Sequence, residues 1–208
     1  MVEQIDAPSG PWIIFPNYSS ISDFIYSSRS VHQFLQVCEG LIRGLGYLHG
    51  LRIAHRDIKT SNLLVDLKPA RLKIIDFDLA KRMKDENEEV EDEVFGTEGY
   101  MAPEIKKSAK YSPIKADRWA CGRMLLSLLD SAKEEAVDRQ LMATEPKVRR
   151  MREFGRALMA QKPAARPAVS EWWTWHGPTL VPSMSSASVR LRSRSRSPED
   201  SVKKARTE

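Results

Sequence analysis

The sequence has little cysteine and no long hydrophobic run. Only two of its 208 residues are cysteines, Cys38 and Cys121, and both lie within apolar patterns of helical spacing. We therefore do not expect a disulfide-stabilised secreted domain. We expect the protein to reside in a reducing compartment, either the cytosol or the nucleus. No stretch approaches the ~18 apolar residues of a membrane span, and the N-terminus lacks the features of a signal peptide. We expect no membrane partner.

The charge is unevenly distributed along the chain. Hydrophobic residues make up 41% of the sequence and charged residues 29%, with a net charge of +5. These values and the length suit one globular domain plus a tail. Residues 85–93 contain seven acidic side chains, whereas the stretch after Val189 contains seven basic and three acidic ones and so contributes +4. The net charge therefore does not indicate a basic surface on the folded part.

Hydrophobic periodicity predicts a mainly helical α+β domain with short β-hairpins. Ser22 is expected to cap the first short helix. In chain order, the expected elements are a strand pair at 2–5 and 12–15, helices at 23–26 and 30–49, a hairpin of 63–65 with 72–75, and helices at 114–129 and 148–160. The Arg/Ser-rich residues 181–208 cannot bury enough apolar area to offset the entropy of ordering. They are predicted to be disordered.

Five short motifs follow one another in a fixed order. They are His55–Arg56–Asp57–Ile58–Lys59 with Asn62, Asp76–Phe77–Asp78, Gly96–Thr97 with Ala102–Pro103–Glu104, Asp117–Arg118–Trp119 with Gly122, and Arg166–Pro167. With a chance of ~1 in 20 per fixed position, a coincidental match over five blocks is negligible. The motifs resemble those of the C-terminal lobe of eukaryotic-type protein kinases, in the serine/threonine class. The resemblance covers roughly Trp12 to Pro178.

The resemblance implies a role for each matching residue. Asp57 would accept the proton of the substrate hydroxyl, Lys59 would neutralise charge on the transferred phosphoryl group, and Thr97 would position the loop and the substrate. Asn62 and Asp76 would bind Mg²⁺. The residues implied as structural supports are His55, Arg56, Glu104, Asp117 and Arg166, with Asp117 bracing the catalytic loop and Arg166 pairing with Glu104.

The nucleotide-binding half of such a kinase has no match in the sequence. No lysine precedes Lys59, so the lysine that anchors the ATP phosphates is absent, and no G-x-G-x-x-G loop is present. The resemblance implies that Pro16, Asn17 and Tyr18 form the hinge against which adenine stacks. We therefore expect an N-lobe remnant at 1–18, a kinase C-lobe at 19–180 and the tail at 181–208. Binding of ATP and Mg²⁺ is conditional on a competent N-lobe.

Two departures from the family pattern leave alternatives open. Asp78 replaces the glycine of the metal-binding loop, and it either restricts that loop or joins Asp76 as a ligand. The acidic run of 85–93 either binds Arg56 in place of a phosphate or is a solvated loop. The run from Ser112 to Trp119, with Asp-Phe-Asp and the acidic segment, also resembles a divergent fungal group of kinase-like proteins.

Two functions are consistent with the motifs. The first is ATP-dependent phosphorylation of serine and threonine hydroxyls of protein substrates. The second is a pseudokinase or C-lobe that docks partner proteins, and an incomplete gene model would reconcile the missing lobe with the first. Nucleic acid is a candidate partner only through the basic tail, which is also consistent with nuclear import. The sequence leaves the oligomeric state unassigned.

Overall fold

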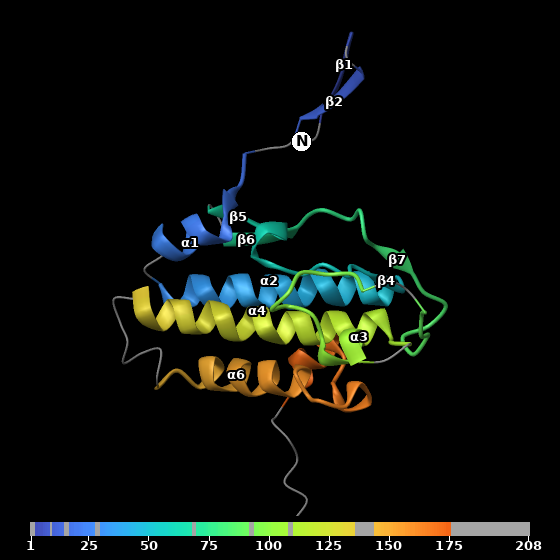
Figure 1. The fold of residues 1–208 in the computed structure, drawn as a ribbon. Helices are drawn as coiled ribbons and strands as arrows, with labels where there is room; N and C mark the ends of the chain where they lie inside the picture. The colour runs from blue at the N-terminus through green and yellow to red at the C-terminus, as the bar shows by residue number, and fades with distance from the viewer. Residues whose placement is uncertain are drawn as a thin grey trace, which may run out of the picture. The chain divides into compact units, whose positions relative to one another are not determined.

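The fold is described from a computed structural model over residues 3–8, 10–14, 17–27, 30–67, 70–91, 94–107, 110–135 and 144–175. The chain divides into two units, 1–177 and 178–208. The second unit, which holds the predicted tail, lies outside the described residues, as does Pro16. The larger unit is mainly helical with small antiparallel sheets (Figure 1), so the predicted α+β class is confirmed.

Seven strands make three small sheets. Their order is β1-β2, β3-β5-β6 and β4-β7. The predicted strand pair near the N-terminus and the predicted hairpin of β5 and β6 are both confirmed. The strands are β1 Glu3–Ala7, β2 Gly10–Ile14, β3 Ser19–Ser20, β4 Ile53–Ala54, β5 Leu63–Leu67, β6 Ala70–Ile74 and β7 Lys81–Arg82.

The helices form the main core. They are α1 Ile21–Ser27, α2 Val31–Gly50, α3 Pro103–Lys107, α4 Pro113–Glu135 and α6 Pro146–Leu158, with short 3-10 helices at Thr60–Asn62, Pro163–Ala165 and Val169–Thr174. Helix α2 packs on α4, and α4 packs on α6, so that the three run side by side (Figure 1). Among the described residues, no helix is both long and apolar enough to cross a bilayer.

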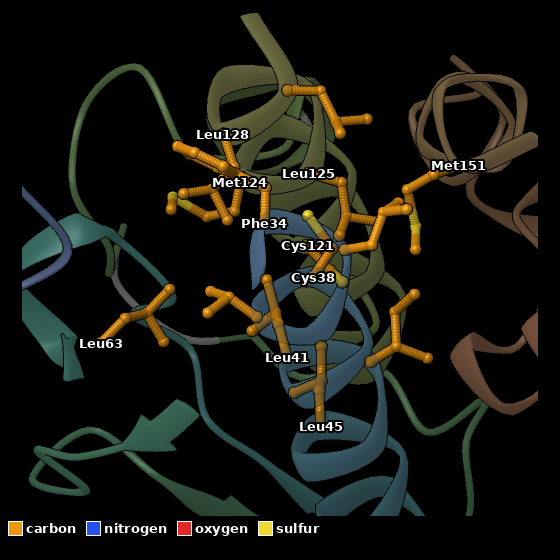
Figure 2. Packing of buried hydrophobic residues seen from close by; sticks show 14 of the residues in the cluster. Phe34, Cys38, Leu41, Leu45, Leu63, Cys121, Met124, Leu125, Leu128 and Met151 are labelled. Atoms are coloured by element: carbon orange, nitrogen blue, oxygen red, sulfur yellow. The ribbon is translucent and has the colours of Figure 1, made fainter. Parts of the chain in front are cut away.

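Both cysteines lie in the contact between α2 and α4. Cys38 and Cys121 are fully buried among Leu41, Met124 and Leu125 (Figure 2). Burial raises the pKa of the Cys38 thiol to about 12 and raises that of Cys121 as well. Because the thiolate is the reactive form, both side chains act as small apolar core groups rather than as reactive thiols.

The β5–β6 hairpin rests directly on α2. A Cβ placed on Gly40 would lie 3.0 Å from Cβ of Leu72, and one on Gly44 would lie 3.1 Å from Cδ1 of Ile74. The two glycines weaken α2 intrinsically, but they let the strand approach the helix closely. This contact fixes the distance between the hairpin and α2, and the open end of the hairpin lies next to Asn62 and Asp76.

The predicted cap of α1 is wrong. Ser20, not Ser22, precedes the helix, and its Oγ accepts a hydrogen bond from the Asp23 amide at 3.0 Å and donates to the Asp23 carboxylate at 2.8 Å. The helix therefore begins at Ile21 because the reciprocal Ser20–Asp23 pair satisfies its first free donors. Helices α4 and α6 also start earlier than predicted, at Pro113 and Pro146, where proline is favoured because its missing N–H is not needed.

The closest backbone approach in the helical core predicts a sensitive position. A Cβ on Gly122 of α4 would lie 2.6 Å from the carbonyl oxygen of Gly155 in α6. Gly122→Ala is therefore expected to lower the free energy of unfolding by ~1–3 kcal/mol, measured by urea denaturation. The matched control is Gly50→Ala at the end of α2, where a Cβ meets nothing within 4 Å. A Gly122→Ala variant as stable as the control would contradict this packing.

Candidate active site

Three side chains donate hydrogen bonds to the carboxylate of Asp57. This residue lies in the loop between β4 and β5 and is 9% exposed. Thr97 Oγ1 donates to Oδ1 at 2.8 Å, and Lys59 Nζ lies 2.6 Å from Oδ2. Asn62 Nδ2 donates to Oδ2 at 3.2 Å and to the Asp57 carbonyl at 2.9 Å. Lys59 Nζ also donates to Thr97 Oγ1 at 3.0 Å, which closes a small network.

This network determines the protonation state of Asp57. Burial of the carboxyl raises its pKa, but the hydrogen bonds from Lys59, Thr97 and Asn62, together with the positive charge of Lys59, lower it by more. The pKa of Asp57 therefore lies below its ordinary value. The group is a carboxylate at neutral pH, as a proton acceptor must be.

Asp117 holds the backbone of the catalytic loop. It is 2% exposed in the first turns of α4, and it accepts the amide N–H of His55 at 2.7 Å and that of Arg56 at 2.8 Å. His49 Nε2 is a third contact at 3.2 Å. Arg56 has a φ of 71°, a left-handed conformation that is costly for a residue with a Cβ. The buried carboxylate therefore stabilises a strained backbone directly before Asp57.

His55 connects the catalytic loop to the Asp76–Phe77–Asp78 segment. Its ring is fully buried, and Nε2 donates to the carbonyl oxygen of Ile75 at 3.0 Å while Nδ1 accepts the Asp57 amide at 3.3 Å. The ring centroid lies 5.0 Å from that of Phe77. His55 is thus a packed structural residue and not a solvent-facing base.

Asn62 and Asp76 lie at the same end of the β5–β6 hairpin. The Ile75 amide donates to the Asn62 carbonyl at 3.0 Å, one step beyond the Leu63–Ile74 pair. Asp76 is exposed and has a φ of 66°. Both residues offer side-chain oxygens, which Mg²⁺ prefers, so the donor set fits this ion. Over the described ranges, no group of three or more His, Cys, Asp or Glu gathers to hold a metal.

The strained residue of the Asp76–Phe77–Asp78 segment is its first aspartate. Asp78 stands where kinases have glycine, yet its φ is not positive, whereas that of Asp76 is. A Cβ at position 78 therefore carries no backbone strain in this conformation. Participation of Asp78 in metal binding stays a prediction.

The acidic run makes contacts that the sequence did not predict. Glu88 accepts the amide of Lys84, Glu91 pairs with Lys110 at 2.7 Å, and Glu86 pairs with Arg118 of α4. The guanidinium of Arg56 stacks over the Phe95 ring at 4.6 Å. Asp92 and Glu93 lie outside the described residues, so binding of the acidic run to Arg56 stays a prediction.

Arg118 is the important residue that the sequence reasoning missed. It is 5% exposed although it is charged. The sequence contains an indication of this role, because Arg118 is a charged residue that interrupts the apolar pattern of α4 directly after Asp117. A charged residue at a core-facing position of a helix indicates a buried partner.

The predicted pair of Arg166 and Glu104 is present and buried. Nη1 and Nη2 of Arg166 donate to the two Glu104 carboxylate oxygens at 2.6 and 2.7 Å. Arg166 also donates from Nε to the Ala160 carbonyl at 2.9 Å and from Nη1 to the Lys115 carbonyl at 2.8 Å. The guanidinium is fully enclosed, so its charge depends on this carboxylate. The pair joins α3 to the segment after α6.

Two of the three predicted hinge residues are described. Asn17 is exposed, and the Tyr18 ring is half-buried with Nζ of Lys73 6.0 Å from its centroid. Contact of this hinge with adenine stays a prediction.

Comparisons with known proteins cover most of the described chain. A model of the protein kinase domain matches residues 17–174. Cysteine-rich receptor-like protein kinase 45 of Arabidopsis thaliana is 42% identical over 134 residues, which is 59% of this chain and 37% of that protein. Cysteine-rich receptor-like protein kinase 6 of Oryza sativa subsp. japonica is 33% identical over 194 residues, which is 77% of this chain and 26% of that protein.

A third relative, a probable LRR receptor-like serine/threonine-protein kinase of Arabidopsis thaliana, is 43% identical over 97 residues, or 45% of this chain and 9% of that protein. The chain thus spans 37% or less of the length of these three relatives. All three are plant proteins, and the resemblance to a fungal group stays a prediction.

The network around Asp57 predicts a pH dependence. Because the folded pKa is lowered, ionised Asp57 stabilises the fold fully above the pKa of ~4 of an unfolded aspartate, and this contribution is lost as the pH falls through the folded pKa. Unfolding free energies of wild type and Asp57→Asn should therefore converge on acidification.

Lys59→Met should raise the Asp57 pKa in a carbon-13 NMR titration, whereas Lys106→Met should not. An unmoved pKa in Lys59→Met would contradict the network.

The Arg166–Glu104 pair predicts a large loss of stability. Arg166→Met leaves Glu104 buried without its cation and is expected to cost ~3–5 kcal/mol in urea denaturation. Lys106→Met removes an exposed partner of Glu98 and should leave the stability unchanged. Equal stability of the two variants would show that the buried pair is not a structural support.

Proposed function

Because this chain belongs to the protein kinase family, we propose that it catalyses ATP-dependent transfer of a phosphoryl group to serine or threonine hydroxyls of proteins. The observation that carries the proposal is the convergence of Thr97 Oγ1, Lys59 Nζ and Asn62 Nδ2 on the Asp57 carboxylate. These donors come from the catalytic loop and from a segment about forty residues later. A carboxylate held in this way suits proton abstraction from an alcohol.

Asp57 is the general base in this proposal. Its lowered pKa keeps the carboxylate ionised, so it accepts a hydrogen bond from the substrate hydroxyl. It takes the proton of that hydroxyl as the new oxygen–phosphorus bond forms and the bond from the γ-phosphorus to the β-phosphate oxygen breaks, which releases ADP. Thr97 and Lys59 hold the carboxylate, and in this proposal the ammonium of Lys59 neutralises negative charge that develops on the transferred group. Most of the catalytic effect of these residues is positioning and electrostatic stabilisation.

Asn62 and Asp76 are the proposed Mg²⁺ ligands. The hairpin end places them together, and the left-handed backbone of Asp76 sets the direction in which its carboxylate leaves the chain. When bound, Mg²⁺ neutralises phosphate charge and orients the phosphates. The tilted ring contact between buried His55 and exposed Phe77 supports the loop that carries Asp76.

The proposed acceptors are serine and threonine. Lys59 stands two residues after Asp57, and Thr97 follows Gly96 in the order typical of this class. The printed name of one relative is a serine/threonine-protein kinase, which supports the same choice. We further propose that the basic tail directs the protein to the nucleus or contacts RNA weakly.

A docking module without catalysis is the second candidate. One feature favours it: the first 58 residues contain no lysine, so the chain has none before the catalytic loop to anchor phosphates. A module of this kind would keep the same fold and bind partner proteins. The two candidates differ in whether the chain binds Mg·ATP.

Transfer of labelled γ-phosphate from Mg·ATP to casein tests the proposal. Wild type should label serine and threonine, and Asp57→Asn should lower the rate ~10²–10⁴-fold because the base is lost. The matched control is Asp130→Asn, which removes an exposed carboxylate paired with Arg152 at the far end of α4 and should keep the wild-type rate.

Thermal unfolding in the presence of Mg·ATP separates the two candidates. A ligand at 100-fold its dissociation constant stabilises the fold by ~2.7 kcal/mol. Asp76→Asn should reduce this shift, and Asp130→Asn should retain it. An intact protein that shows neither stabilisation nor labelling would overturn the enzyme and support the docking module.

A further inference from the structure

Two adjacent residues near the start of α4 hold two different loops. Asp117 accepts the backbone amides of the catalytic loop, as described above. The next residue, Arg118, instead reaches residues 76–104, here called the activation segment, where its Nη2 donates to the carboxylate of Glu86. Its Nη1 donates to the carbonyl oxygen of Arg166 at 3.1 Å.

The charge of Arg118 depends on Glu86. The Arg118 side chain is 6% exposed, so water contributes little to its solvation. Its Nε is buried and has no partner in the described part of the chain. Glu86 is the only carboxylate paired with it among the described residues. Moving Glu86 away would leave a cation buried and uncompensated, which strongly disfavours such movement.

The backbone of Glu86 is held as well as its side chain. Its carbonyl oxygen accepts a hydrogen bond from Oγ of Ser112, a residue that is 5% exposed, at 2.9 Å. Four residues later, Val90 and Tyr111 form an antiparallel bridge with N···O distances of 2.9 and 3.2 Å. The activation segment is therefore attached to residues 111–118 at two successive points.

The other described ion pair of the acidic run, Glu91 with Lys110, differs in the exposure of its cation, whereas Glu86 is itself 56% exposed. Glu91 and Lys110 are 65% and 57% exposed. Exposed pairs of this kind contribute little to stability, because water and salt screen them. Glu86 and Glu91 thus provide two carboxylates of the same segment, one bound to a buried cation and one to a solvated cation.

We infer that Arg118 is a positioning residue that acts through Glu86. It holds the activation segment in the arrangement in which Thr97 contacts Asp57, and a fixed carboxylate does this without phosphorylation of the segment. The inference deepens the proposed function, since it concerns the regulation of the same site. Its contacts and its test do not require turnover, so failure of one does not imply failure of the other.

Hydrogen exchange measured by mass spectrometry tests the anchor. The full chain is treated with a phosphatase first, so that no phosphate contributes. Peptides covering 84–91 should be protected in wild type, and Glu86→Gln should speed their exchange at least tenfold. Glu91→Gln makes the same chemical change in the same segment and should leave exchange near the wild-type rate. Similar exchange in the two variants would overturn the inference, as would loss of protection on phosphatase treatment of wild type.

The methyl NMR signal of Thr97 tests positioning separately from stability. Glu86→Gln should shift or broaden this signal, whereas Glu91→Gln should leave it in place, with the signals of the α2 core unchanged in both. Arg118→Gln should reproduce the effect of Glu86→Gln. If Arg118→Gln does not fold, the comparison of Glu86→Gln with Glu91→Gln tests the inference without it. An unchanged Thr97 signal in Glu86→Gln would show that the anchor does not position the site.

Discussion

The arrangement of this site depends on the burial of one carboxylate. Asp117 is enclosed in the first turns of α4, and the backbone amides of His55 and Arg56 are its partners. An unpaired buried carboxylate is costly, so these hydrogen bonds are retained even though Arg56 must adopt a positive φ. The orientation of Asp57, the next residue, follows from this constraint. The core helix thereby determines the geometry of a loop that has little regular structure.

Close packing between the elements supplies the rest of the site. Gly40 and Gly44 seat the β5–β6 hairpin on α2, and the end of that hairpin carries Asn62 and Asp76. The buried His55 ring then joins this hairpin to the catalytic loop through Ile75 and Phe77. Functional side chains that are held by rigid elements keep their geometry better than those on free loops. The acidic and basic groups of the site are thus placed by apolar packing that takes no part in chemistry.

Much of the fold was predictable because its signals are local. The apolar spacing of α2, α4 and α6 and the paired runs of β5 and β6 lie within short stretches, so each element was found from its own residues. Element ends were less predictable. The choice between Ser20 and Ser22 as the cap of α1 depends on which hydroxyl can reach Asp23, and that is a matter of backbone geometry.

The sequence by itself indicated the family and the grouping of Asp57, Lys59 and Asn62, because these residues share one loop and their spacing alone brings them together. It also indicated Glu104 and Arg166 through their motifs. Only the tertiary structure decided that Glu86, among seven acidic residues of one run, is the partner of Arg118. Every carboxylate of that run has the same charge, so composition cannot select one of them. Burial of the Arg118 guanidinium selects it, since the fold brings Glu86, of the described part of the run, to that buried cation.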